Sequence, residues 1–263
     1  MNTLTTPHLA LINQTIDNIF PPSDTPLHEA TRHSLEGGKR IRPLLTLSVM
    51  ETFDSPIEKA LVPACTLELV HTYSLIHDDL PCMDDDDFRR GKPSLHKAFP
   101  ESLALLTGDY LLTLAFELLT HAPKVSAEDK IALINTLSHL AGETGMIGGQ
   151  ILDLTATDLT LEQLEEMHLK KTGALITASL LFGGILSGAD LPPLQSIGAQ
   201  LGIAYQFIDD LIDGNGAVDI IGPKQTQEFA HTLYQNAHQE ILALKPATPL
   251  LEQLAHDLIF RTA

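Results

Sequence analysis

The sequence contains no tryptophan, and aromatic residues make up only 5% of its 263 residues, although 44% of them are hydrophobic. Leu, Ala and Ile supply most of the apolar side chains, and these residues favour helices packed on helices over a β-sandwich. The strict alternation of apolar and polar residues that predicts a half-buried strand is also missing. We therefore expect an all-α protein with a sizeable core.

Basic residues are scarce. The chain has 16 Lys and Arg against 34 Asp and Glu, which gives a formal net charge of −18. This balance argues against a nucleic-acid partner, because a phosphate backbone is bound by a basic surface. An acidic protein can still bind an acidic substrate if divalent cations lie between them.

Cysteines are equally few. Cys65 and Cys82 cannot form a disulfide framework for a chain of this length, so a reducing cytoplasm is expected. The first twenty residues lack the basic region and the small-residue cleavage site of a signal peptide. No uninterrupted run of 18 apolar residues occurs, so no membrane span is expected and the protein should be soluble.

Helix start and stop signals recur along the chain. Proline and glycine predict helices from Thr6 to about Phe20, from the Pro21–Asp24 break to Gly37-Gly38, after Pro43, and from Ser55-Pro56, with a bend at Pro63, to near Asp79. Further helices are expected at about residues 101–121, 126–142, 145–156, 160–188, 192–213, 224–243 and 247–261. Ser126-x-x-Asp129 and Thr160-x-x-Gln163 fit capping boxes. About ten helices with short connections predict one large bundle, a single domain over residues 1–263.

An acidic motif follows the fourth predicted helix, and six of the ten residues that begin at Asp78 are aspartate. Asp78 and Asp79 end a helix whose preceding residues, 67–76, are mostly apolar. Carboxylates are unfavourable at a helix C-terminus unless a cation compensates them. Arg89 and Arg90 come next, and arginine makes forked contacts with phosphate oxygens. A solvated acidic loop is the alternative, because most charge runs are solvated.

A second acidic motif begins at Gln206. Asp209 and Asp213 are one helical turn apart and Asp210 is three residues before Asp213, so all three are expected to face one side of the helix. Like charges at this spacing repel and indicate a metal. Mg²⁺ takes one or two carboxylates together with substrate phosphates. Two acidic motifs at the ends of two long apolar helices therefore predict a magnesium site.

Taken together, the motifs resemble those of the short-chain trans-isoprenyl diphosphate synthases, closest to their bacterial farnesyl diphosphate synthase branch. The resemblance runs from about Leu27 to Asp213 and resumes over the last helices. Its motifs are Gly37-Gly38-Lys39-Arg40-Ile41-Arg42-Pro43, His71, Asp78-Asp79-x4-Asp84, Arg89-Arg90-Gly91-Lys92-Pro93, Gly148-Gly149-Gln150-x2-Asp153-Leu154, Lys171-Thr172-Gly173-Ala174-Leu175 and Gln206-x2-Asp209-Asp210-x2-Asp213. It implies a helical bundle of the isoprenoid synthase type around a central apolar cavity.

The resemblance also implies roles for individual residues. The expected metal ligands, for two or three Mg²⁺ ions bound with the diphosphate, are Asp78, Asp84 and Asp209, supported by Asp79 and Asp213. The expected contacts to the allylic diphosphate are Arg89, Lys171, Thr172 and Gln206. The expected contacts to isopentenyl diphosphate are Lys39, Arg42, His71 and Arg90. The catalytic set is then Asp78, Asp84, Asp209 and Lys171, and no side-chain nucleophile is needed.

The implied reaction is the head-to-tail condensation of dimethylallyl and geranyl diphosphates with isopentenyl diphosphate, which releases pyrophosphate and gives (2E,6E)-farnesyl diphosphate. Tyr73 precedes Asp78 by five residues, so the helical rise places it about 7.5 Å deeper, where a ring would form the floor of the pocket. With Ser74 and the Leu80–Met83 stretch, it fits the farnesyl branch, since geranylgeranyl synthases usually carry a smaller residue here. A homodimer is expected from the resemblance alone.

Structural interpretations of these residues also exist. Lys39 and Arg42 could be surface charges, His71 and Tyr73 could belong to the core, and Lys171 could neutralise Glu165 or Glu166. Three other functions are open. A geranyl or geranylgeranyl diphosphate synthase would differ only in product length. A class I terpene cyclase would not need the 37–43 and 171–175 motifs, because it holds no second diphosphate. A non-catalytic partner subunit usually loses acidic motifs, and this chain keeps both.

The chain departs from the family after Asp213. Family members have a longer segment here that includes a Gly-Lys pair and a later Lys-Thr, and both are missing. Either the protein lacks this loop, or a mobile loop has been omitted from the chain at this point. The second explanation is favoured, because lids over diphosphate sites are mobile when empty and Gly214–Gly216 is an abrupt join.

Overall fold

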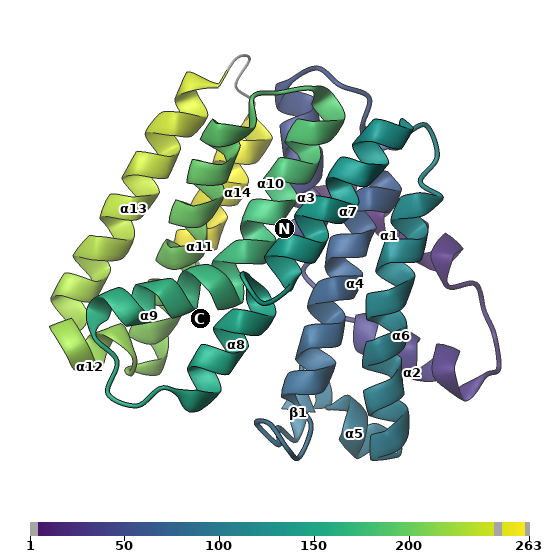
Figure 1. The fold of residues 1–263 in the computed structure, drawn as a ribbon, viewed down its shortest axis with the longest axis horizontal. Helices are drawn as coiled ribbons and strands as arrows, with labels where there is room; N and C mark the ends of the chain where they lie inside the picture. The colour runs from purple at the N-terminus through teal and green to yellow at the C-terminus, as the bar shows by residue number, and fades with distance from the viewer. Residues whose placement is uncertain (1–4, 245–248, 261–263) are drawn as a thin grey trace.

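Helices build almost the whole protein in the computed structural model, which describes residues 5–244 and 249–260 (Figure 1). The α-helices are α1 (Thr6–Ile19), α2 (Pro26–Leu35), α3 (Ile41–Thr52), α4 (Leu61–Asp78), α5 (Leu95–Ala98), α6 (Glu101–Thr120), α7 (Ala127–Ala141), α8 (Met146–Thr155), α9 (Leu161–His168), α10 (Ala174–Ser187), α11 (Leu191–Asp213), α12 (Ala217–Ile221), α13 (Pro223–Ala243) and α14 (Pro249–Ile259). A 3₁₀ turn, η1 (Ile57–Lys59), and a π-helical turn, η2 (Leu169–Gly173), complete them. The predicted all-α class is confirmed.

Strand structure within the described residues is limited to one antiparallel hairpin. Its strands β1 (Phe88–Arg89) and β2 (Lys92–Pro93) pair Phe88 with Pro93 and Arg89 with Lys92. The hairpin lies beside the C-terminal end of α4 (Figure 1). It therefore holds the arginines of the first acidic motif against the bundle.

The core is centred on α10, most of whose side chains are buried. This helix packs against α3, α4, α7 and α11. Gly183 permits the closest approach to α3, because a Cβ built there would lie 2.5 Å from Cβ of Val49. In Figure 1 the end of α4 and the short α12, which follows α11, both lie at the lower end of the bundle. The fold thus brings the two acidic motifs to the same end.

Two predicted helix starts are wrong. Helix α3 begins at Ile41, because Arg40 adopts a left-handed conformation with φ +58° and turns the chain there. Pro43 consequently lies in the first turn, where its missing N–H has no helical partner to lose. The chain from Ser55-Pro56 forms η1 first, and α4 starts only at Leu61. Pro63 is then in the first turn of α4 instead of at a bend.

The cap at Thr160 is confirmed as a full capping box, since Gln163 N–H donates to its hydroxyl and Thr160 N–H donates to the Gln163 side chain. Ser126 accepts only the N–H of Asp129, at 3.0 Å. The helix expected over 160–188 is interrupted by η2, and α5 and α12 were not predicted. Part of the helix expected at 247–261 lies outside the described residues.

Two helical segments are long and apolar enough to cross a membrane when judged by length and composition alone. Leu161–Ser187 is 72% buried over its most apolar window, as a core helix should be. Glu101–Thr120, which is α6, is only 33% buried over the corresponding window. Because the expectation of no span was based on uninterrupted apolar runs, it did not identify this uncovered apolar side of α6.

Candidate active site

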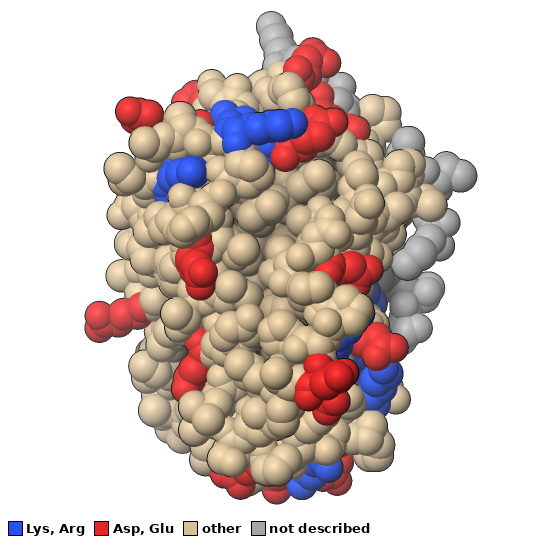
Figure 2. Space-filling model, turned by 90° about the vertical axis from the view of Figure 1, so that its right-hand side faces the viewer, with Lys and Arg blue, Asp and Glu red and all other residues tan. Residues whose placement is uncertain are grey.

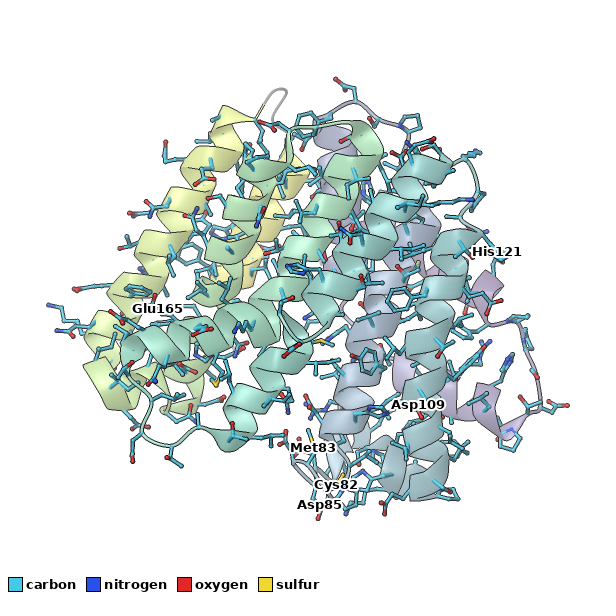
Figure 3. All side chains as sticks on the ribbon, viewed as in Figure 1. Cys82, Met83, Asp85, Asp109, His121 and Glu165 are labelled. Atoms are coloured by element: carbon cyan, nitrogen blue, oxygen red, sulfur yellow. The ribbon has the colours of Figure 1, made fainter. Side chains whose placement is uncertain are left out.

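The first acidic motif folds back on itself at the end of α4. The N–H of Asp84 donates to the carbonyl of Asp78 at 2.9 Å, which places the two aspartates together. Burial raises the pKa of the Asp78 carboxyl to about 6; nearby Lys171 opposes this shift and Asp84 adds to it. Figure 3 shows Cys82 and Met83 in this loop, at the lower edge of the molecule. Asp78 therefore lies between a like charge in its own loop and a cation from η2.

Asp79 points in another direction. Its carboxylate is almost fully buried and accepts hydrogen bonds from Nε and Nη2 of Arg89 at 2.8 and 2.5 Å. Arg89 also donates to Asp86 at 2.7 Å. Burial raises the pKa of Asp79, and Arg89 opposes this shift. In this structure Asp79 anchors Arg89, which in turn lines the cavity described below.

Arg90 occupies the turn of the hairpin with a φ of +55°, followed by Gly91 with a φ of +75°. Its Nη1 donates to the carbonyl of Ser34 at 2.8 Å, and its Nη2 lies 3.4 Å from Oε1 of Glu68. The two consecutive arginines thus point to different partners. Arg89 is held by the aspartates, and Arg90 is held by α2 and α4.

The π-helical turn η2 forms a second wall of the site, next to the wall formed by the end of α4 and the hairpin. Such turns are frequent at functional sites. A Cβ on Gly149 would lie 2.2 Å from the backbone N of Lys171, and a Cβ on Gly202 would lie 2.3 Å from Cα of Gly173. Because Gly149 of α8 and Gly202 of α11 have no side chain, the backbones of these two helices contact the backbone of η2 directly. Lys171 projects from this turn and forms an ion pair with Asp153 at 2.5 Å.

The second acidic motif does not present all three aspartates to one side, so that prediction is wrong. Asp210 is 7% exposed and accepts the N–H of Ala217 at 2.9 Å. It also lies 3.1 Å from Nε2 of His168, a buried residue of α9. Asp209 lines the cavity and Asp213 is exposed. Successive residues are rotated by about 100° around a helix, so Asp210 faces the bundle interior while Asp209 and Asp213 share another side.

A cavity of about 780 Å³ lies between these walls. Five cationic side chains line it, with three acidic ones. Its lining residues are Gly37, Lys39, Arg40, Ile41, Arg42, Glu68, His71, Leu75, Arg89, Arg90, Thr172, Ile176, Tyr205, Gln206, Asp209, Asp257 and Leu258. The cavity thus collects residues from both predicted diphosphate sites. The predicted residues that do not line it are Asp78, Asp79, Asp84, Lys171, Asp213, Tyr73 and Ser74.

The cavity is built for an anion. Burial lowers the pKa of Arg42, whose Nε is a buried donor without an acceptor. Such an unsatisfied donor costs about 1–3 kcal/mol, which an anionic ligand would recover. Burial, reinforced by Arg42, Arg90 and Arg89, holds the pKa of His71 well below its usual value. His71 is therefore neutral at pH 7 and available for hydrogen bonding.

Sequence reasoning missed four polar residues of the lining, namely Arg40, Glu68, Tyr205 and Asp257. Arg40 belongs to the Gly37–Pro43 motif, but the family resemblance implies no role for it. Glu68 is a charged residue in an otherwise apolar stretch of α4, one helical turn before His71, and this contrast could have revealed it. Tyr205 immediately precedes Gln206. Asp257 belongs to α14, far along the chain, and no sequence signal connects it to the other residues.

No group of three or more His, Cys, Asp or Glu is already arranged around a metal position within residues 5–244 and 249–260. Asp78 and Asp84 form one carboxylate pair, and Asp209 and Asp213 lie one turn apart on α11. Each pair offers two carboxylates as hard oxygen ligands, and burial together with the neighbouring Asp84 carboxylate raises the pKa of Asp78. This arrangement fits Mg²⁺ bound jointly by carboxylates and a substrate diphosphate.

The explanation favoured for the short segment after Asp213, an omitted mobile loop, is wrong. The full sequence has 263 residues, and the structure carries it without a break from Asp213 through α12 to Pro223. Gly216, with a φ of +58°, closely approaches Asp210, because a Cβ there would lie 2.6 Å from the carboxyl carbon. The short connection is therefore a folded part of the site.

A helical bundle with a cationic cavity and two carboxylate pairs at one end fits a prenyltransferase, and the comparisons with known proteins show this class. Residues 24–234 match the polyprenyl synthetase family, and the chain belongs to that family. It is 44% identical over 249 residues to the farnesyl diphosphate synthase of Micrococcus luteus, covering 92% of this chain and 84% of the relative. It is 37% identical over 264 residues to a chloroplastic geranylgeranyl pyrophosphate synthase of Catharanthus roseus, covering 89% and 74%. The crystal structure of an FPP/GFPP synthase from Zymomonas mobilis superposes with a TM-score of 0.89 at 34% identity and covers 95% of both chains.

Proposed function

We propose that this protein condenses dimethylallyl and geranyl diphosphates with isopentenyl diphosphate and releases (2E,6E)-farnesyl diphosphate. The observation that carries this proposal is the cavity of about 780 Å³, because its five cationic side chains suit two diphosphates at once. The 44% identity to a farnesyl diphosphate synthase supports the fifteen-carbon product.

Three classes of residue would share the work. The first class would hold two or three Mg²⁺ ions together with the allylic diphosphate, and its members are Asp78, Asp84, Asp209 and Asp213. Asp79 would join them after it releases Arg89. Lys171, Thr172, Gln206 and Arg89 would bind the same diphosphate. Lys39, Arg42, His71 and Arg90 would bind isopentenyl diphosphate. The adjacency of Asp78 and Lys171 across the two walls supports this division.

Magnesium, when bound, supplies Lewis-acid stabilisation of the departing pyrophosphate. The residues of this chain contribute binding and orientation. The cationic lining holds the homoallylic diphosphate so that its double bond faces the allylic carbon, and this positioning lowers the entropic part of the barrier. The apolar residues Leu75 and Ile176 in the lining exclude water from the reacting carbons. Pyrophosphate itself can accept the proton that is lost, so no side-chain base is required.

Tyr73 is the proposed limit on chain length, with Ser74 beside it. Its ring is 95% buried and packs edge-on against His77, with ring centroids 5.7 Å apart. Its hydroxyl is buried without a hydrogen-bond partner. The side chain is therefore surrounded by packed neighbours, and a growing chain that reached it would meet a rigid wall.

The test is to incubate the purified protein with dimethylallyl and isopentenyl diphosphates, with and without Mg²⁺, and to separate the dephosphorylated products by chromatography. We expect a fifteen-carbon alcohol only when Mg²⁺ is present. A twenty-carbon product would identify a geranylgeranyl synthase. A cyclic hydrocarbon formed from geranyl or farnesyl diphosphate without isopentenyl diphosphate would identify a cyclase, and no product from any of these substrates would indicate a non-catalytic subunit.

We also propose a homodimer whose interface includes α6. This helix leaves Leu105 and Leu106 exposed and is only 33% buried over its most apolar window. A second copy would cover this surface. We further expect one domain over residues 1–263, a cytoplasmic location and no nucleic-acid partner. Figure 2 supports the last expectation for one face, where the few basic side chains are scattered among acidic ones.

A further inference from the structure

Glu68 is a buried carboxylate among the cationic side chains that line the cavity. Its side chain is only 2% exposed on α4 and is one turn from His71. A negative charge at this position would repel a diphosphate if it were unpaired. It accepts a hydrogen bond from Nη1 of Arg40 at 2.9 Å and lies 3.4 Å from Nη2 of Arg90. One carboxylate oxygen, Oε1, therefore receives both arginines.

Both arginines adopt a left-handed backbone conformation, which residues other than glycine rarely adopt. Arg40 has a φ of +58° and Arg90 has a φ of +55°. Such a residue is strained unless the surrounding structure holds it in place. Arg40 occupies the position before the first residue of α3, and Arg90 lies in the turn of the hairpin. The two strained positions are far apart in the sequence and converge on a single carboxylate.

The remaining contacts extend this cluster to the rest of the fold. Arg40 donates through Nε to Asn13 of α1 at 3.1 Å, and Arg90 donates to the carbonyl of Ser34 of α2 at 2.8 Å. Gly38 lies directly against the cluster. A Cβ built on it would lie 2.4 Å from Nη1 of Arg40 and 2.7 Å from Oε1 of Glu68. Because a side chain at Gly38 would disturb the contact, the cluster and the glycine turn depend on each other.

We propose that Glu68 is a positioning residue that holds Arg40 and Arg90 in place for the diphosphate of the homoallylic substrate. This inference rests on the proposed function and deepens it. Glu68 does not contact the reacting atoms. It fixes the geometry of the cationic wall before substrate arrives, so that the arginines do not have to be ordered during binding. Without it, two like charges would face each other in a buried site.

The first test compares Glu68→Gln with wild type in steady-state kinetics for each substrate separately. Glutamine keeps the shape and removes the charge. We expect the KM for isopentenyl diphosphate to rise about tenfold or more, which corresponds to the loss of one charge-assisted contact. The kcat and the KM for the allylic substrate should stay within about twofold. Glu68→Asp, which restores the charge, should lie closer to wild type.

The second test separates geometry from charge. Gly38→Ala leaves every charge in place, and its φ is not in the left-handed region, but the new Cβ collides with the Arg40–Glu68 contact. It should raise the KM for isopentenyl diphosphate selectively, as Glu68→Gln does. This variant also serves if Glu68→Gln fails to fold. The matched control is Glu51→Gln, which removes a partly buried ion pair with His8 at 2.8 Å that is not part of the cavity lining. It should leave both KM values unchanged.

Two results would overturn the proposal. If Glu68→Gln binds isopentenyl diphosphate as tightly as wild type, or more tightly, then Glu68 only lowers the positive charge of the cavity and does not position the arginines. If the KM values for both substrates rise together, then Glu68 serves the fold in general. Either result leaves the proposed function standing as long as wild type forms a prenyl product. The proposed function fails separately, if wild type forms none.

Discussion

Asp78 and Asp209 belong to different carboxylate pairs, and the proposed magnesium chemistry needs both. Asp78→Ala or Asp209→Ala should each lower kcat/KM by about a thousandfold or more, because the stabilisation of one ion at the departing pyrophosphate would be lost. Asp219→Ala, on α12, is the control and should have little effect. The measurement is the initial rate at saturating Mg²⁺. Near-normal activity in either variant would refute the assignment.

His71 should make stability depend on pH. Burial lowers its pKa in the folded protein, while the unfolded chain titrates near the usual value of about 6.5. Below that pH the unfolded state binds a proton that the folded state cannot, so this contribution to stability is lost as the pH falls. Asp78, with its raised pKa, acts in the opposite direction but is common to wild type and variant.

The measurement for His71 is urea unfolding of wild type and His71→Gln at several pH values between 5 and 7.5. Between pH 6.5 and 5.5 wild type should lose up to about 1.4 kcal/mol more than the variant, the value for one proton per pH unit. Parallel stability curves would show that His71 titrates alike in both states.

Tyr73 gives the sharpest test of product length. Tyr73→Ala should shift the product from fifteen toward twenty carbons, because removing the ring opens space for roughly one further isoprene unit along the bundle axis. The cavity should also cost about 3–5 kcal/mol of stability, as other aromatic truncations in cores do. Products are compared by chromatography at excess isopentenyl diphosphate. A variant that still stops at fifteen carbons would make Tyr73 ordinary core.

At the scale of whole elements, local sequence signals predicted what local physics determines. The start signals of α7 and α9 are caps formed by Ser126 and Thr160, whose partners are three residues away. The features that were missed depend on distant partners. Asp210 faces inward because its carboxylate hydrogen-bonds with His168, 42 residues before it, and accepts the N–H of Ala217. Glu68 meets Arg40 and Arg90, 28 and 22 residues away. These contacts join segments that are distant in the sequence, so the hydrophobic periodicity of a single segment cannot predict them.

The π-turn η2 was missed for the same reason, and it leads to a prediction about the element. Gly202→Ala would place a Cβ 2.3 Å from Cα of Gly173 and push α11 away from η2. Because Lys171 and Thr172 project from this turn, the kcat/KM for the allylic substrate should fall by about tenfold or more. The control is Ala189→Gly, in the short connection between α10 and α11. An unchanged rate in Gly202→Ala would show that the π-turn does not position Lys171.

At the scale of the whole molecule, the uncovered side of α6 predicts the oligomeric state. Leu106, which is 57% exposed, should lie within the proposed dimer interface. Leu106→Glu should convert dimers to monomers, because a charge buried in an apolar interface without a partner costs several kcal/mol. Leu242→Glu, on α13 and 47% exposed, is the matched control. Sedimentation velocity measures the oligomeric state of wild type and of both variants. A monomeric wild type would contradict the proposed dimer.

The folded connection between α11 and α13 has a consequence for binding thermodynamics. The N–H of Ala217 is bonded to Asp210, and α12 gives the middle of this connection a regular helical backbone. A substrate that enters this end of the bundle therefore orders little additional backbone, whose immobilisation would cost roughly 1–2 kcal/mol per residue. Calorimetric titration with a non-reactive diphosphate should accordingly show only a small unfavourable conformational entropy and a heat-capacity change no larger than the buried ligand surface accounts for.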